Sequence, residues 1–211
     1  MLIRSEVNRK AVSVSATIDM AEHLAQTLDN HIDGLEIGSA LRYRIAGGCL
    51  DMALEHHKAV VLLVARQLRG SAFSIMRLQF EAYVRGVWLH QCATDTELAA
   101  FTNEKLDHSF AALVSAIEGL DGFSDGALSK ARRNSWAAMC SFIHTGFLQV
   151  VRRNRETTVE PDYNDDEVIE ALGFANAIAL LAALEIAHIA GAERLSVELL
   201  DLARNIATPV Q

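Results

Sequence analysis

The sequence contains little proline and few aromatic residues. Only two of its 211 residues are proline, and 6% are aromatic. Pro161 and Pro209 both lie outside the long periodic segments, so no proline interrupts a helix there. Threonine and tyrosine, which favour strands, are scarce, whereas alanine and leucine dominate. These absences disfavour a β-rich fold and predict an all-α protein.

Cysteine is equally sparse, and no long run is purely apolar. The three cysteines are Cys49, Cys92 and Cys140. Their odd number and wide spacing indicate reduced core thiols in a cytoplasmic protein, and MLIRSEVNRKAVS at the N-terminus has no apolar signal-peptide core. The run FANAIALLAALEIAHIAGA (174–192) carries Asn176, Glu185 and His188. We therefore expect a buried helix there and no membrane span.

Basic residues are also in deficit, because the formal net charge is −8. Such a chain lacks the diffuse basic surface of most nucleic-acid-binding proteins, so any contact with RNA needs a local patch. Hydrophobic residues make up 51% of the chain, which excludes a disordered protein. The length suits one domain with a sizeable core, which we place at residues 1–211.

Apolar periodicity predicts a single-domain bundle of six to seven helices. The predicted helical segments are 5–28, 39–70, 71–93, 94–105 with a continuation to 119, 124–153, 166–190 and 192–207. Ser39, Thr94 or Thr96, and Asp165 or Asp166 are the expected N-caps of their helices. The segments 119–126 and 154–166 read as loops, and His144-Thr145-Gly146 is a candidate interruption of the helix at 124–153. We expect the helices at 71–93 and 166–190 to lie most centrally.

The predicted helix 71–93 carries three charges at four-residue spacing. Arg77, Glu81 and Arg85 span about 80° of an otherwise apolar helix. Glu81 can therefore pair with both arginines in a ladder. One interpretation is an ion network that fixes the register of the bundle. The other is that one arginine faces a cleft and binds a carboxylate or a phosphate.

Arg85-Gly-Val-Trp-Leu-His90 is an R-x4-H pattern that resembles the signature of HEPN-domain proteins. The resemblance implies a HEPN-like bundle and a metal-independent endoribonuclease of toxin–antitoxin or phage-defence systems, with no cofactor. His90 would be the general acid/base, and Arg85 would stabilise charge on the scissile phosphate. Gly86 departs from the family pattern, which usually has a polar residue there. The two side chains lie about 140° apart, so convergence needs a distorted helix end or a homodimer partner. The alternative for His90 is a surface histidine near a helix C-terminus that interacts with the macrodipole.

A second pattern joins the charged stripe to a later histidine. Arg77, Glu81 and Arg85, together with His144 and Gly146 in IHTG, resemble uncharacterised bacterial helical domains with an Arg-x3-Glu stripe and a later His-x-Gly. That resemblance implies that His144 meets the stripe in space and joins the catalytic candidates. The alternative is a single core histidine bonded to a carboxylate or carbonyl.

Two further groups complete the candidates. Glu185 and His188 form E-x-x-H, but a ferritin-like dimetal site needs a second such motif and two more glutamates, so we expect a buried Glu–His pair and no metal. Arg152 and Arg153 lie in the densest positive patch and are candidate contacts for RNA phosphate. The alternative role of these arginines is to compensate the helix macrodipole.

Three functional hypotheses follow from these patterns. The first is the HEPN-like ribonuclease, with Arg85, His90 and His144 in catalysis and Arg77, Glu81, Arg152 and Arg153 in binding. The second is a non-catalytic homodimeric interaction protein whose Arg–Glu–Arg network is structural. The third is a ferritin-like metal protein. Whether the charged stripe opens into a pocket discriminates between the first two.

Overall fold

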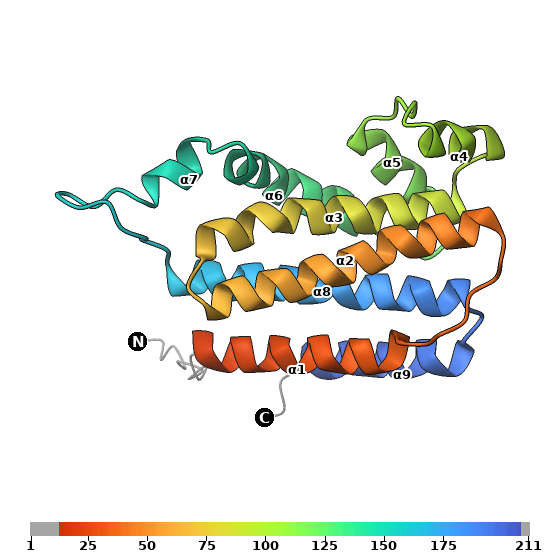
Figure 1. Ribbon diagram of the computed structural model, residues 1–211, viewed down its shortest axis with the longest axis horizontal. Helices are drawn as coiled ribbons and strands as arrows, with labels where there is room; N and C mark the ends of the chain where they lie inside the picture. Colours follow the sequence, from red (N-terminus) through yellow and green to blue (C-terminus); the bar gives the residue numbers. More distant parts are fainter. Residues whose placement is uncertain (1–12, 208–211) are drawn as a thin grey trace, which may run out of the picture.

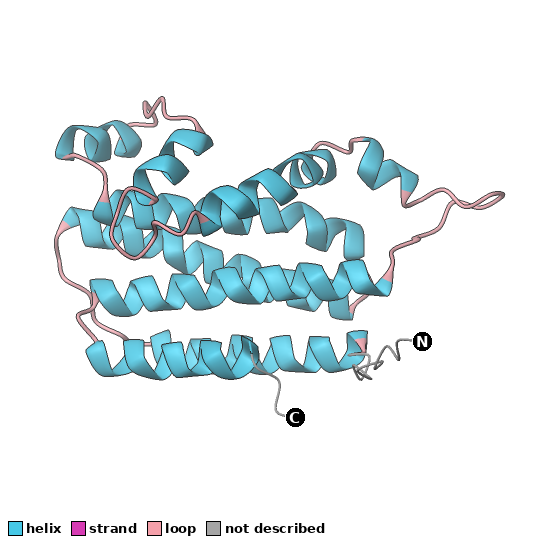
Figure 2. Cartoon of the chain, turned by 180° about the vertical axis from the view of Figure 1, so that it is seen from behind, coloured by secondary structure: helices cyan, strands magenta, loops and turns pink. Residues whose placement is uncertain are grey.

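All the regular elements in the described part of the protein are helices. A computed structural model describes residues 13–207, and side chains up to Arg204. These residues form nine helices: α1 (Val14–Ile32), α2 (Leu41–Ala65), α3 (Arg69–Gln91), α4 (Asp95–Thr102), α5 (Phe110–Ile117), α6 (Ala127–Ile143), α7 (Phe147–Val151), α8 (Asp165–Ile189) and α9 (Glu193–Ala207). Within residues 13–207 there is no strand, only an isolated bridge between Asn154 and Val159 (Figure 2). The predicted all-α class is confirmed.

The long helices run along one axis, with α8 between the others (Figure 1). α8 contacts α1, α2, α3 and α9, while α6 packs on the opposite side of α3. α4 and α5 lie at the end of the bundle where α3 finishes, and α7 with the loop after it lies at the other end (Figure 1). α3 and α8 run in the same direction, so their C-terminal turns lie at the same end.

α3 and α8 are apolar nearly all round because both lie in the core, where most of their side chains are buried. Phe80 is fully buried and packs edge-on against Phe110 of α5 and Phe174 of α8. Between α2 and α3, a Cβ placed on Gly86 would come within 2.6 Å of Leu50. The two helices therefore pack closely at a position where the sequence supplies no side chain.

The observed helix boundaries correct two predictions. The second helix ends at Ala65 and not at Gly70, because Gln67 adopts φ of 60° and turns the chain into α3. Gly70 instead lies inside α3, where a Cβ would meet the Tyr163 hydroxyl at 2.7 Å. The segment 124–153 divides into α6 and α7 at His144-Thr145-Gly146, the candidate interruption in the sequence. The helices within residues 13–207 thus outnumber the predicted six to seven, and residues 5–12 of the first predicted helix lie outside the described residues.

The capping predictions hold in part. Of the two predicted candidates, Thr94 and not Thr96 caps α4, in a reciprocal capping box with Glu97. α8 begins one residue early, because Asn164 accepts a hydrogen bond from the Asp166 N–H. α2 follows Ala40, which makes no side-chain cap, so Ser39 is not its N-cap.

α8 is long and apolar enough to cross a membrane by length and composition alone. In the fold, 67% of its most apolar 18-residue window is buried inside the bundle. Its polar residues also have partners, since Asn176 bonds to His57 of α2. α8 therefore packs as the core helix that the sequence predicts.

Candidate functional site

The charged stripe of α3 divides between two environments. Arg77 donates to Glu81 at 2.8 Å, and both side chains are about four-fifths buried. The Arg77 guanidinium also lies over the ring of Trp136, 4.5 Å from its centroid, and donates to the Cys140 sulfur at 3.3 Å. Arg77 is therefore neutralised and packed against α6.

Arg85 is in a different position, because the predicted ladder forms only in its first half. Among the described residues Arg85 makes no side-chain hydrogen bond and no ion pair within 4.0 Å, although it is half-buried. It lines a cavity of about 520 Å³ together with Ile45, Phe101, Thr102, Glu104 and Leu106. Thr102 and Glu104 are exposed, so the cavity opens to solvent.

The environment of Arg85 also acts on a cysteine of α2. Burial raises the pKa of the Cys49 thiol, while the positive charge of Arg85 partly opposes that change. The thiol therefore stays protonated near neutral pH and behaves as a small core group. Glu104 lines the same cavity, but it forms no ion pair with Arg85 within 4.0 Å.

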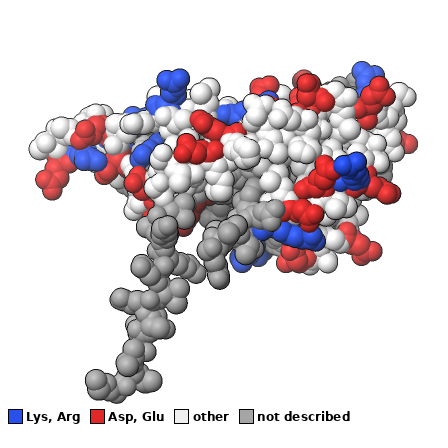
Figure 3. Space-filling model, turned by 90° about the horizontal axis from the view of Figure 1, so that it is seen from below, with Lys and Arg blue, Asp and Glu red and all other residues white. Residues whose placement is uncertain are grey.

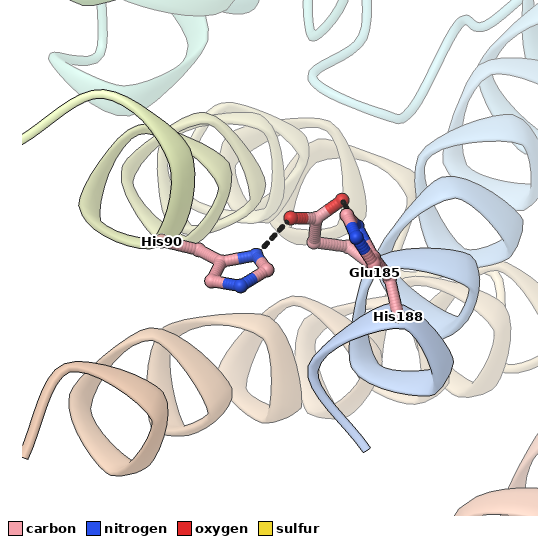
Figure 4. Close-up of side chains that lie close together, drawn as sticks. All are labelled: His90, Glu185 and His188. Carbon is pink, nitrogen blue, oxygen red and sulfur yellow. Dashed lines mark hydrogen bonds and ion pairs between the residues drawn. The ribbon is translucent and has the colours of Figure 1, made fainter. Parts of the chain in front are cut away.

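His90 lies in the last turn of α3 and faces α8, away from the Arg85 cavity. Its Nδ1 lies 2.6 Å from Oε1 of Glu185, and Gln91 donates to the same oxygen at 2.7 Å. His188, one turn after Glu185, brings its Nδ1 to 3.8 Å from Oε2. Figure 4 shows the two imidazoles on either side of the carboxylate. We call His90, Glu185 and His188 the histidine–glutamate cluster.

Burial within the cluster is graded from the inside outwards. Glu185 is 6% exposed, the His90 side chain 12% and the His188 side chain 64%. The His90 ring packs edge-on against Tyr43 and against His188, with centroids 5.7 Å and 5.2 Å apart. The cluster therefore joins α3 to α8 and meets solvent through His188.

Glu185 is the buried partner of the predicted Glu–His pair, but its main partner was not foreseen. The sequence pattern paired Glu185 with His188 of its own helix, whereas the short hydrogen bonds come from His90 and Gln91 of α3. Spacing within one helix carries no signal for a contact across the bundle. The nearby Cys92 thiol has its pKa raised, first by burial and then by the charge of Glu185.

His144 does not join the charged stripe. It is the C-cap of α6 and is exposed, and the described residues form no side-chain hydrogen bond with it. α6 reaches Arg77 through Trp136 and Cys140 instead. The His-x-Gly pattern marks the break before α7, because a Cβ on Gly146 would come within 3.1 Å of the Ser141 backbone.

The predicted basic patch is largely neutralised where its partners are described. Arg152 forms a two-point ion pair with Glu167, and its Nε donates to Oε2 at 3.0 Å. That hydrogen bond raises the pKa of the Arg152 guanidinium. Arg153 is exposed, while Arg155 pairs with Asp162. On the face seen in Figure 3, basic and acidic side chains likewise lie interspersed.

The sequence-predicted candidates therefore occupy separate places. Arg77 and Glu81 pair against α6, Arg85 lines its own cavity, and His90 faces α8. His144 and Arg152 lie toward the far end of the bundle, near α7 (Figure 1). Their catalytic and binding roles stay predictions, since geometry alone does not test them.

Comparison with protein families gives a match over most of the chain. Residues 50–210 match the profile of a family of unknown function, DUF6988. Neither the curated proteins nor the solved structures include a match. The matched segment contains Arg85 and all three residues of the histidine–glutamate cluster.

Proposed function

The chain belongs to the family of unknown function DUF6988, and we propose that it is a binding protein for a ligand with a phosphate or carboxylate group, held at Arg85. The observation that carries this proposal is a half-buried arginine in an open cavity, with no acidic partner among the described residues. A half-buried guanidinium that no protein carboxylate pairs with is suited to bind an anion from outside, because its planar donors match carboxylate and phosphate oxygens.

The lining of the cavity suggests what else the ligand carries. Ile45, Phe101 and Leu106 are half-buried apolar side chains that can cover an apolar or aromatic part. Glu104 adds a carboxylate that accepts hydrogen bonds, which suits a ligand hydroxyl beside the acidic group. A cavity of about 520 Å³ is within the range of small-molecule sites.

Phenyl phosphate and benzoate test the proposal, because each joins an acid to an aromatic ring. We expect the wild-type protein to bind at least one of them in titration calorimetry, and Arg85→Met to bind it about 10- to 100-fold more weakly. That loss corresponds to one charged hydrogen-bonded pair. Comparison of the two probes shows whether phosphate or carboxylate is preferred.

Arg44→Met is the matched control, since Arg44 is exposed on α2 beside Ile45 and its loss changes the net charge equally. This variant should bind like the wild type. Equal affinity of Arg85→Met and wild type, or no binding of either probe by wild type, would refute the proposal.

A second candidate is the HEPN-like metal-independent endoribonuclease. The observation that favours it is the contact of the His90 Nδ1 with the buried Glu185, which can orient an imidazole for acid–base chemistry. Arg85 would then contact the phosphate. Against it stands the separation of Arg85 and His90 into different surroundings. The predicted homodimer, the defence role and the cytoplasmic location remain proposals.

RNA cleavage assays in EDTA test this candidate. If it is correct, wild type cleaves single-stranded RNA, and the attack of the 2′-hydroxyl leaves a 2′,3′-cyclic phosphate and a 5′-hydroxyl. His90→Ala should slow cleavage by about 10²- to 10⁴-fold, while His144→Ala shows whether that exposed histidine takes part. Lack of cleavage across varied RNAs, or unchanged cleavage by His90→Ala, would contradict it.

A further inference from the structure

The histidine–glutamate cluster has the donor set of a metal site. His90, Glu185 and His188 each offer one ligand atom, and these atoms all lie within 4.8 Å of one another. Two imidazoles and one carboxylate suit divalent first-row transition metals. We propose that the cluster binds one such ion, with Zn²⁺ the best match to its nitrogen and oxygen donors. The inference is independent of the proposed function at Arg85.

The carboxylate of Glu185 is only half used by the protein. The hydrogen bonds from Gln91 and His90 both involve Oε1. Among the described residues Oε2 forms no hydrogen bond, and its nearest basic partner is the His188 nitrogen at 3.8 Å. Oε2 does not belong to the buried side-chain atoms that lack a partner, so solvent still reaches it. Oε2 is therefore the atom that an ion would engage.

To hold an ion, His90 must release its 2.6 Å hydrogen bond from Nδ1 to Glu185 Oε1 or offer its other ring nitrogen, and the donors must move apart. Ligand bonds of about 2.1 Å bring tetrahedral donors to about 3.4 Å from one another. His188 is 64% exposed and can rotate inward without disturbing the core. Figure 4 shows that its ring already lies beside the carboxylate. Because His188 is exposed, an ion from solvent can reach the cluster on this side.

The helices favour a cation at this place. His90 lies one residue before the end of α3, and His188 one residue before the end of α8. The negative ends of both helix dipoles therefore point toward the cluster. Gln91 holds the carboxylate in place from α3 and would act as a positioning residue for the ligand.

The site is of the open kind. The described residues offer three protein ligands, whereas structural zinc sites usually use four. A fourth position remains for water or for a group of a ligand, where an ion can polarise the bound oxygen. An ion on His90 and a metal-independent acid–base role for His90 exclude one another, so EDTA separates the two proposals.

The test is titration of ZnCl₂ and CoCl₂ into the tag-free full chain after metal removal with a chelator. We expect one ion per chain. His188→Ala should bind at least about tenfold more weakly, since loss even of groups behind the ligands costs that much. Glu185→Gln should also weaken binding and alter the visible absorption of bound Co²⁺. Because His188 is mostly exposed, His188→Ala should fold normally.

His108→Ala is the matched control. His108 and Glu97 also form a histidine–carboxylate pair, 3.0 Å apart, but without a second histidine. Unchanged Zn²⁺ affinity of this variant is expected. The inference is overturned if wild type binds no ion in one-to-one ratio, or if His188→Ala binds as tightly as wild type. Either result would leave the cluster as a structural hydrogen-bond network.

Discussion

Substitution of Gly86 by asparagine is expected to lower the free energy of unfolding by about 3 kcal/mol or more. The Cβ would lie 2.6 Å from Cγ of Leu50 and 3.2 Å from the carbonyl oxygen of Ala46. Leu50 is fully buried, so its side chain has no free space to move into. The amide would also enter the contact between α2 and α3 without designated partners. Urea denaturation measures the change.

Gly48→Ala is the control for the Gly86 prediction. Gly48 lies in the interior of α2 with open space around its Cβ position. Alanine there should raise stability by up to about 1 kcal/mol through helix propensity. Stability of Gly86→Asn within about 0.5 kcal/mol of wild type would show that α2 and α3 can separate without loss.

The close packing at Gly86 explains how this chain departs from the HEPN pattern. HEPN proteins usually carry a polar residue directly after the arginine, and here the helix contact leaves no room for one. The departure therefore has a packing reason, because α2 and α3 meet at this point. To accommodate a polar side chain at this position, α2 and α3 would have to lie further apart.

The free energy of unfolding is also expected to depend on pH through His57. This histidine is 1% exposed and bonds to Asn176 of α8 at 2.8 Å. Burial lowers the pKa of His57 below its ordinary value of 6.5, although the bond to Asn176 opposes that shift. The unfolded chain therefore binds a proton more readily than the folded chain. Stability is retained above pH 6.5 and lost as the pH falls toward the lowered pKa.

The size of the pH effect follows from the coupling between proton binding at His57 and folding. One proton gives a slope of at most about 1.4 kcal/mol per pH unit. Unfolding in urea at several pH values between neutral and mildly acidic should show this slope in wild type. His57→Gln should flatten the profile, because glutamine does not titrate and can still bond to Asn176.

His144→Gln is the control for the pH prediction, since it also removes a histidine but an exposed one. Its profile should follow that of the wild type. A His57→Gln profile as steep as the wild-type profile would mean that other groups carry the acid sensitivity.

Local signals in the sequence were enough for much of the fold. The threonines at 94 and 96 marked the start of α4, and Thr94 proved to be the cap. The helices at 71–93 and 166–190, apolar nearly all round, were correctly predicted to be central. Gly70 was misread as a helix end, because a glycine that permits close packing looks the same in sequence as one that ends a helix.

The candidate site was predictable only in its parts. The four-residue spacing of Arg77, Glu81 and Arg85 correctly placed the charges on one stripe and allowed Glu81 to pair with either arginine. The packing of α6 against α3 decided between the two arginines. Trp136 and Cys140 engage Arg77, while Arg85 remains beside a cavity.

What the sequence alone determined is the helical class and the residues that each helix carries, since helix periodicity is a local property. Only the tertiary structure decided that His90, Glu185 and His188 meet and that His144 does not join Arg77. α3 and α8 are separated by many residues but run side by side in the same direction (Figure 1). Their register depends on the burial of both helices along their whole length, and no local pattern contains it.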